Sequence, residues 1–389
     1  MKRRILIQGA GIAGPALAVA LDPNQWDITV VERAPSLRTG GQAVDFRGPI
    51  HRAVLDRLNL WDAIWQRKTP GNELWLLRAD GSAIAQIPPV MISGDVEIVR
   101  GDLSALLVAR SHAKYRFSDC VTAIDDSGNE ARVTFASGET GEYDLVVGAD
   151  GLHSTVRSLC FSNAKVHHEG HRLAIFSMPD QWMLHGRALM YSELGRCVTL
   201  THGGPGRASV QLVFAGPELS REERTNPEVL RALLRTTYAG MQWEMPRILE
   251  SLERASEIYA DSIATVKPGP FSKGRVALLG DSAWGGTLGG QGTSLAIVGA
   301  YVLSQELAAT PGDLRGALNR FEVKLKPYAL ECQKGATHAG GFHAPVTRLG
   351  MFARNTFYRL MSSKLLSAQF EKLVKSSASS FALPEYANG

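Results

Sequence analysis

The N-terminal stretch constrains this chain more than any other, because a short apolar strand runs directly into a Gly-x-Gly-x-x-Gly turn and a helix of small residues. The strand spans Arg4 to Gln8, and the turn carries Gly9, Gly11 and Gly14. The first glycine permits a tight turn, the second lets a phosphate approach the backbone, and the third lets the helix lie close on the sheet. Free N–H groups at the helix N-terminus favour phosphate binding. The stretch therefore predicts a dinucleotide-binding βαβ unit.

A second apolar strand, from Trp26 to Val31, ends on Glu32. An acidic side chain at this place accepts hydrogen bonds from ribose hydroxyls and repels a 2′-phosphate. A glycine-rich turn alone can be purely structural, but the strand before it and the helix and acid after it favour a ligand site. We therefore expect FAD or NAD at this end of the chain.

The bulk composition excludes several classes of protein. The chain has 389 residues, enough for about two domains, and its 44% hydrophobic and 21% charged residues are ordinary for a globular protein. The net charge of +4 is small and no run of Lys or Arg occurs, so we expect no nucleic-acid partner. The longest apolar stretch is too short to span a bilayer, and no signal-peptide region fits before the first strand. We expect a cytoplasmic protein without a membrane span.

Cysteine and histidine residues show no metal-binding spacing. The four cysteines are far from one another in the sequence, and no Cys-x-x-Cys occurs. Several histidines lie between residues 165 and 265, but without a fixed ligand spacing. We expect free thiols in a reducing compartment and no metal site.

Two arginines, Arg47 and Arg100, can each be interpreted in two ways. The glycine-rich segment 40–48 is expected to be a conformationally free loop near the carboxyl ends of the first strands, where open α/β sheets bind ligands. Arg47 in this segment is either a ligand-site cation or a solvated loop residue. Arg100, just before a helix expected at 103–110, either reaches a ligand at the sheet edge or is an ordinary cation near a helix end. An amphipathic helix is expected at 50–66 and a hairpin leading to a second sheet at 73–87.

The middle of the chain changes character after a buried strand at 143–147. That strand leads into Asp150 and Gly151, and a helix is expected to start between Asp150 and Arg157. Short strands between residues 165 and 265 then predict an antiparallel sheet. Helical segments are expected at 226–239 and 246–253.

A further buried strand, 274–281, ends on Asp281, and a glycine-rich turn then opens a helix at 295–308. Bare N–H groups at such a helix start can stabilise negative charge on a planar ligand, although the turn could be purely structural. Beyond it, helices are expected at 314–330 and 346–374. The last carries an apolar stripe mixed with Arg and Lys, which usually packs on the protein's own core; membrane or partner contact is the alternative.

The order of these motifs resembles that of the class A flavin-dependent aromatic hydroxylases, the para-hydroxybenzoate hydroxylase type, over nearly the whole chain. The motifs are the dinucleotide loop with Glu32, the Asp150-Gly151 turn with Arg157, and Gly280-Asp281 before a glycine-rich helix start. The resemblance implies an α/β fold, with a Rossmann-like FAD-binding domain, an inserted antiparallel-sheet substrate domain and a C-terminal amphipathic helix. The expected boundaries are 1–72, 98–164 and 266–330 for the FAD-binding domain, 73–97 and 165–265 for the substrate domain, and 331–389 for a C-terminal helical cap.

The resemblance also implies a set of site residues. The ADP half of FAD would be held by Gly9, Gly11, Ile12, Ala13, Gly14, Glu32 and Arg33. Arg100, with Leu103 beside it, would contact the ribitol or pyrophosphate, and Asp281 the ribityl side. Gly290, Gln291, Gly292 and Thr293 would place a helix dipole at the flavin pyrimidine, with Gln42 and Val44 at the ring's other edge. Asp150 and Gly151 would serve both FAD and a passing NADH or NADPH, and Arg47 would face the active site as the candidate catalytic residue.

The short chain and its long closing helix are similar to those of the tetracycline-inactivating monooxygenases, whose terminal helix lies over the substrate domain. The sequence departs from many relatives after Gly280-Asp281, where Ser282-Ala283-Trp284-Gly285-Gly286 replaces a small pair, a His and a later Pro. Gly299 also stands where an acid is frequent. We expect Trp284 to pack beside the flavin, so that this departure affects the substrate more than the binding of the flavin.

The expected function is insertion of one oxygen atom from O2 into a polycyclic phenolic or polyketide-type substrate, using FAD and NADPH or NADH, with tetracycline antibiotics as one candidate substrate. A hydroxylase of another aromatic compound, in catabolism or natural-product biosynthesis, is the first alternative. A non-oxygenating flavin reductase and a flavin-bound sensor are further alternatives, whereas the Trp-x-Trp-x-Ile-Pro signature of halogenases is absent. We expect a monomer or a weak dimer.

Overall fold

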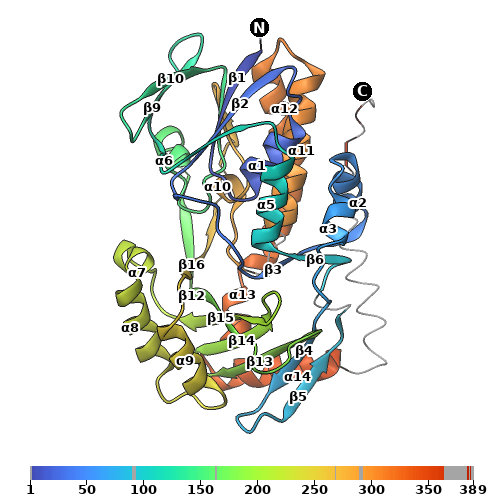
Figure 1. The fold of residues 1–389 in the computed structure, drawn as a ribbon, viewed down its shortest axis with the longest axis vertical. Coiled ribbons are helices and arrows are strands. Elements are labelled where there is room, and N and C mark those ends of the chain that lie inside the picture. The colour runs from blue at the N-terminus through green and yellow to red at the C-terminus, as the bar shows by residue number, and fades with distance from the viewer. Residues whose placement is uncertain are drawn as a thin grey trace.

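The structure is a computed structural model that describes residues 2–89, 93–162, 164–267, 269–288, 292–362, 383–384 and 386. Figure 1 shows two regions along the long axis, a mostly parallel sheet with helices at one end and a large antiparallel sheet at the other. The expectation of a mixed α/β fold is confirmed. In the described part of the chain, no helix has the length and apolar character needed to cross a bilayer.

The first sheet has six strands in the order β17-β18-β11-β1-β2-β7. The strands are β1 (Arg3–Gln8), β2 (Trp26–Glu32), β7 (Lys114–Phe117), β11 (Leu145–Gly148), β17 (Ser272–Lys273) and β18 (Val276–Leu278). All neighbours pair in parallel except β17 and β18. Because helices cover it, β1 is buried continuously from Ile5 to Gln8, as parallel strands are. The carboxyl ends of β1, β2, β11 and β18 therefore meet at one edge.

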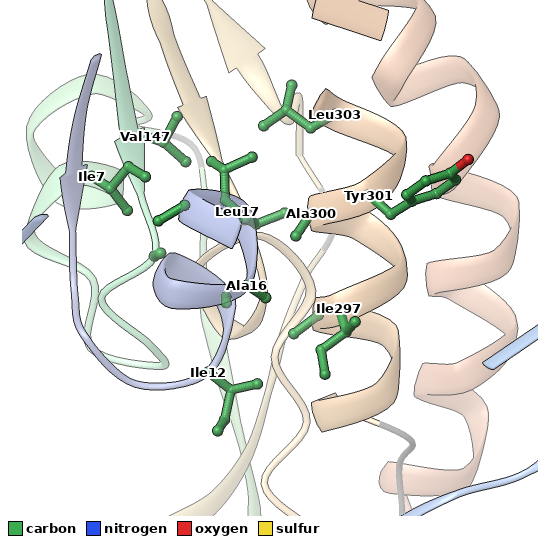
Figure 2. Close-up of a cluster of buried hydrophobic side chains, with 14 of the residues drawn as sticks. Ile7, Ile12, Ala16, Leu17, Val147, Ile297, Ala300, Tyr301 and Leu303 are labelled. Atoms are coloured by element: carbon green, nitrogen blue, oxygen red, sulfur yellow. The ribbon is translucent and has the colours of Figure 1, made fainter. Parts of the chain in front are cut away.

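Small residues let two helices approach this sheet closely. Helix α1 (Ala13–Ala20) packs between β1 and α11 (Gly292–Ala309), as Figure 2 shows for Ala16 and Leu17 opposite Ile297 and Ala300. α1 contains mainly Ala, Gly and Pro, and its residues Ala13 to Ala18 are buried. The other helices of this region are α5 (Arg100–Arg110), α6 (Thr155–Cys160), α10 (Asp281–Trp284) and α12 (Leu314–Ala336).

The segment expected to be a free glycine-rich loop is partly a strand. β3 (Ala43–Phe46) pairs with β6 (Val96–Val99) in a two-stranded antiparallel sheet, because Val44 and Phe46 alternate into the core. The single helix expected at 50–66 is also wrong. It is divided into α2 (Gly48–Arg57) and α3 (Trp61–Trp65), since Asn59 between them has a φ of 54° that no helix continues.

One expected helix start shifts by three residues, and another lies within its expected range. α5 begins at Arg100, so this arginine is inside the first turn rather than before it. α6 begins at Thr155, within the expected range, because Ser154 caps it through a hydrogen bond from the Arg157 N–H. A separate three-stranded sheet holds β8 (Val121–Asp125), β9 (Ala131–Phe135) and β10 (Thr140–Tyr143).

The second large sheet has seven strands in the order β16-β12-β15-β14-β13-β4-β5. Its strands are β4 (Glu73–Leu77), β5 (Ala83–Ile87), β12 (Val166–Pro179), β13 (Arg187–Glu193), β14 (Arg196–His202), β15 (Arg207–Ala215) and β16 (Ile258–Val266). All neighbours are antiparallel except β13 and β4. The hairpin expected at 73–87 thus joins the expected antiparallel sheet, whereas the long strands β12 and β16 were not predicted.

Helices cover both faces of this sheet. α8 (Pro227–Tyr238) and α9 (Met245–Glu253) bury Leu234 and Ile248 on one face, next to α7 (Arg221–Thr225). α13 (Ala339–His343) and α14 (Arg348–Met361) lie on the other face, where Tyr358 and Met361 join the core. α14 lies within the helix expected at 346–374, whose C-terminal part falls outside the described residues.

Candidate functional site

The dinucleotide loop needs its three glycines for different reasons. Gly9 has a φ of 114°, and a Cβ there would lie 2.4 Å from the Ala149 carbonyl oxygen. A Cβ at Gly14 would lie 2.0 Å from the Gly9 carbonyl oxygen. Among the described residues, a Cβ at Gly11 would meet only the Arg100 guanidinium, at 3.7 Å. Gly9 and Gly14 are therefore required by the fold, whereas the space at Gly11 can be used by a ligand.

Glu32 holds this loop from the end of β2. Its Oε2 accepts a hydrogen bond from the Ala10 N–H at 2.8 Å, and its Oε1 accepts one from the Ala34 N–H at 2.9 Å. A carboxylate has lone pairs for further donors, so Glu32 can still accept a ribose hydroxyl. The neighbouring Arg33 is exposed and donates to Thr155 Oγ1 at 3.0 Å, which ties β2 to the start of α6.

Arg100 and Gln42, far apart in the sequence, are joined through their backbones. The Arg100 N–H donates to the Gln42 carbonyl at 3.1 Å, and the Gly101 N–H donates to the Gly40 carbonyl at 2.9 Å. Among the residues that the structure describes, none makes a hydrogen bond or ion pair with the Arg100 guanidinium, which is only partly buried. A cation in this position is available for an anionic ligand in front of Gly11.

The Asp150 turn and the Asp281 turn contact each other. Ser282 Oγ accepts a hydrogen bond from the Gly151 N–H at 3.1 Å and approaches Asp150 Oδ1 at 3.3 Å. The Asp150 carboxylate also accepts a hydrogen bond from the Thr155 N–H at 2.6 Å at the start of α6. Asp150 therefore fixes the turn, and the Ser282 hydroxyl that links the two motifs was missed by the sequence analysis.

Asp281 lies at the meeting point of three elements. Gly280 before it has a φ of 67°, and a Cβ there would lie 2.8 Å from Ala13 Cβ, so this turn touches the start of α1. A Cβ at Gly292, the first residue of α11, would lie 3.5 Å from Asp281 Oδ1. The side chain is accessible to solvent yet surrounded by protein, and this burial raises the pKa of the Asp281 carboxyl, while Arg100 opposes the shift. Asp281 is therefore accessible to a ligand beside Arg100 and the start of α11.

The remaining predicted cofactor residues fall in three groups. Ile12, Ala13, Val44 and Leu103 are buried in the core around the loop. Gly292 and Thr293 form the start of α11, whose free N–H groups suit an anionic group. Gly290 and Gln291 lie outside the described residues.

Arg47 is held by its own surroundings. Its guanidinium donates to the Ser93 carbonyl at 2.7 Å and lies 3.7 Å from Asp45 Oδ2, and its N–H donates to His51 Nδ1 at 3.0 Å. Burial lowers the pKa of His51 to about 4, so this imidazole is neutral and can accept that hydrogen bond. Nothing in this geometry tests the catalytic role expected for Arg47, which stays a prediction.

A polar cluster on β16 was not predicted at all. His153 Nε2 lies 2.8 Å from Asp261 Oδ1, and the Tyr259 hydroxyl lies 3.4 Å from Asp261 Oδ2. The Arg38 guanidinium lies 5.3 Å from the centre of the Tyr259 ring. Tyr259 and Asp261 are two positions apart on one strand, and this spacing could have indicated that they share a face. Their partners come from distant loops, however, which the spacing does not identify. Burial and the neighbouring Asp261 raise the pKa of the Tyr259 hydroxyl.

The expectation that Trp284 packs beside the flavin is wrong. Its ring is fully buried in the core, with its centre 5.0 Å from that of Phe271 and 6.4 Å from that of Phe321. A Cβ at Gly299 would lie 3.0 Å from this ring. Gly299 therefore leaves the space that the Trp284 ring fills. The structure also places no group of three or more metal-binding side chains together within the residues it describes.

The arrangement fits FAD. An open position at Gly11, a guanidinium at Arg100 that no described residue pairs with, a carboxylate at Asp281 and a helix N-terminus at Gly292 surround one location, and these are the groups that hold phosphates and sugar hydroxyls. Bound there, FAD would supply the redox chemistry, since protein side chains do not activate O2 themselves.

Comparison with known proteins agrees with this fit. The family described as FAD binding domain matches residues 2–318. An uncharacterised protein of Mycobacterium tuberculosis is 35% identical over 343 residues, which cover 83% of this chain and 90% of that protein. A flavin-dependent monooxygenase of Legionella longbeachae is 30% identical over 340 residues, which cover 85% of this chain and 87% of that protein. The crystal structure of tetracycline destructase Tet(51) matches with a TM-score of 0.82 and 29% identity, over 99% of this chain and 100% of that one.

Proposed function

We propose a reaction for this chain, which belongs to the FAD binding domain family and is a class A flavin-dependent monooxygenase. In this proposal the protein uses NADPH or NADH and O2 to insert one oxygen atom into a polycyclic phenolic or polyketide-type substrate. The observation that carries the proposal is the meeting of Gly11, Arg100, Asp281 and the start of α11 around one location. Arg100, Asp281 and the start of α11 would hold FAD there, and the cofactor would supply the hydride-accepting and O2-activating chemistry.

In the proposed site, basic and N–H groups contact the negatively charged parts of FAD, and carboxylates contact its hydroxyl groups. The loop at Gly9 to Gly14 and the Arg100 guanidinium would hold the pyrophosphate, while Glu32 would accept hydrogen bonds from the adenosine ribose. Asp281 would accept hydrogen bonds from ribityl hydroxyls. The N–H groups at Gly292 and Thr293 would stabilise negative charge on the ring edge nearest α11.

The substrate would be held between this site and the seven-stranded sheet. A Cβ at Gly40, in the loop joined to Arg100, would lie 3.9 Å from Ser177 Oγ on β12, and Leu288 packs against the same sheet face. That face is mainly apolar, with Ile175 and Met190 in its core. An apolar face suits a polycyclic substrate and excludes water from the reacting atoms.

Tetracyclines are the narrower proposal for the substrate. Similarity to a tetracycline destructase over the full chain supports it, as does α14, which places Tyr358 and Met361 on the same sheet face. We also retain, as predictions, a cytoplasmic location and a monomer or weak dimer.

The test is consumption of NADPH and of NADH by the purified, flavin-loaded protein, with and without a panel of tetracyclines and simpler phenols, together with product masses. Acceleration by a tetracycline whose product gains one oxygen atom would support an antibiotic-modifying hydroxylase. Acceleration by phenols alone would support the alternative, a hydroxylase of another aromatic compound. Consumption that no compound stimulates, with no oxygenated product, would favour a flavin reductase or sensor and contradict the proposal.

A further inference from the structure

The outward side of α14 is apolar. The helix packs Arg354, Tyr358 and Met361 towards the protein, but Leu349 is 77% exposed and Phe352 is 66% exposed on its other side. Leu360, 49% exposed, continues the same stripe two turns later, since residues spaced by three, four or eight positions share one helix face. Figure 1 shows α14 running along the end of the molecule that lies far from β1.

The apolar side chains of α14 are part of a larger patch. Val346 before the helix is 59% exposed, and Phe342 of α13 is also exposed. A cleft of about 320 Å³ between these helices is lined by Phe342, Pro345 and Ala353, among others. Single exposed apolar residues are normal on a protein surface, but several large ones on one helix and the turn before it indicate an interaction surface. We call Phe342, Val346, Leu349, Phe352 and Leu360 the α14 patch.

The charged residues of α14 itself all have one sign, and a carboxylate close to the patch is that of Glu169, which lines a hollow with Phe342. No Asp or Glu occurs between His343 and Ser362, whereas Arg348 and Arg359 are exposed at the two ends of the helix. Arg354 beneath them donates to Ser192 Oγ at 2.9 Å and to the His343 carbonyl at 2.8 Å. In the part of the chain that the structure describes, no carboxylate forms an ion pair with Arg354, so its charge adds to the positive potential of this surface.

We propose that the α14 patch docks on the surface of an anionic lipid bilayer. A helix with an apolar stripe and basic ends lies in the plane of the interface, with its apolar side chains among the acyl chains and its arginines at the headgroups. The buried side of α14 is fixed to the sheet, so the whole stripe can contact a flat surface at once. A second copy of this chain fits less well, because a two-fold axis through the patch would bring the same arginines together.

The test is cosedimentation of the full-length, FAD-loaded protein with vesicles. Vesicles of phosphatidylcholine alone are compared with vesicles that also contain phosphatidylglycerol. We expect binding to the anionic vesicles, weakened by added salt. Phe352→Asp should reduce the partition coefficient about tenfold or more, since it places a charge in the apolar stripe, and Arg359→Gln should reduce it about fivefold.

Val323→Asp is the matched control, because Val323 is 65% exposed on α12, outside the patch. It should bind vesicles as the natural protein does, and flavin absorbance and basal NAD(P)H consumption of Phe352→Asp should be unchanged, which shows that the variant is folded. Failure to bind anionic vesicles, or an equal loss in Val323→Asp, would overturn the proposal. A dimer in sedimentation velocity that Phe352→Asp abolishes, without vesicle binding, would identify the patch as a self-association surface and also overturn it.

Discussion

Replacement of Gly11 by alanine should separate cofactor binding from folding. Of the residues that the structure describes, a methyl group at this position would contact only the Arg100 guanidinium, at an ordinary distance of 3.7 Å, and Gly11 does not adopt a positive φ. The cofactor-free protein should therefore tolerate Gly11→Ala, with a free energy of unfolding unchanged or raised by about 0.4–1 kcal/mol through reduced freedom of the unfolded chain. The FAD phosphates, by contrast, are expected where the methyl group would project.

The size of the effect on binding follows from overpacking. An extra methyl group in a close-packed site costs about 1–3 kcal/mol, which corresponds to an FAD dissociation constant raised roughly 5- to 150-fold. Gly14→Ala is the matched comparison, because its Cβ would lie 2.0 Å from the Gly9 carbonyl oxygen. That variant should lose stability even without FAD, since backbone atoms would have to move.

The assay is titration of cofactor-free protein with FAD, followed by flavin fluorescence, alongside thermal unfolding of the same preparations. The expected result is weak FAD binding with normal stability for Gly11→Ala, and low stability for Gly14→Ala. Binding of FAD to Gly11→Ala within about twofold of the natural protein would refute the placement of the phosphates.

Three further predictions concern charged groups at the site. Arg100→Ala should weaken FAD binding by about 1.5–3 kcal/mol in the same titration, whereas Arg110→Ala at the exposed end of α5 should leave it unchanged; equal effects would contradict the role of Arg100. Because burial raises the pKa of Asp281 above its value in the unfolded chain, ionisation of this carboxyl opposes folding as pH rises through and above that range. Asp281→Asn should therefore raise the free energy of unfolding of the cofactor-free protein at neutral pH, as measured by denaturant titration. In acid, where the carboxyl is protonated in the folded and the unfolded state, the substitution should leave the free energy of unfolding unchanged. An increase that persists in acid would contradict the direction of the pKa shift. Asp150→Ala should lower the free energy of unfolding by about 0.5–2 kcal/mol, because Asp150 accepts a hydrogen bond from the Thr155 N–H at the start of α6, and an unchanged melting temperature would show that this hydrogen bond does not matter.

Local patterns predicted the first region of the fold well. The apolar strand before Gly9, the glycine turn and the second strand ending on Glu32 are determined by neighbouring residues, and the structure has β1, α1 and β2 there. The resemblance to class A flavin monooxygenases is likewise confirmed, because three motifs in a fixed order are far more specific than any one of them.

Contacts between distant segments could not be predicted from the sequence. The Ser282 hydroxyl joins two turns 131 positions apart, and the His153–Asp261 pair joins residues 108 positions apart. Neither has a local pattern. Trp284 was placed wrongly because its environment depends on the space left by Gly299 on another helix. The helix expected at 50–66 is interrupted at Asn59, whose positive φ cannot be inferred from the spacing of hydrophobic residues.

The candidate site could be predicted from the sequence only in part. Gly11, Arg100 and Asp281 were expected from the resemblance, and the structure brings them together around one location. The roles of Arg47 and of the residues at Gly290 and Gln291 stay predictions, as do the expected domain boundaries. Side-chain roles depend on ligand contacts, and those are what the proposed titrations measure.

The most direct test of the account is the origin of the oxygen atom in the product. The flavin-loaded protein is supplied with NADPH or NADH and with each compound of the tetracycline and phenol panel, under isotopically heavy O2 in ordinary water. The account predicts a product that contains one heavy oxygen atom, formed only when the nicotinamide is present. A product whose new oxygen comes from water, or the absence of any oxygenated product while the nicotinamide is consumed, would contradict a monooxygenase.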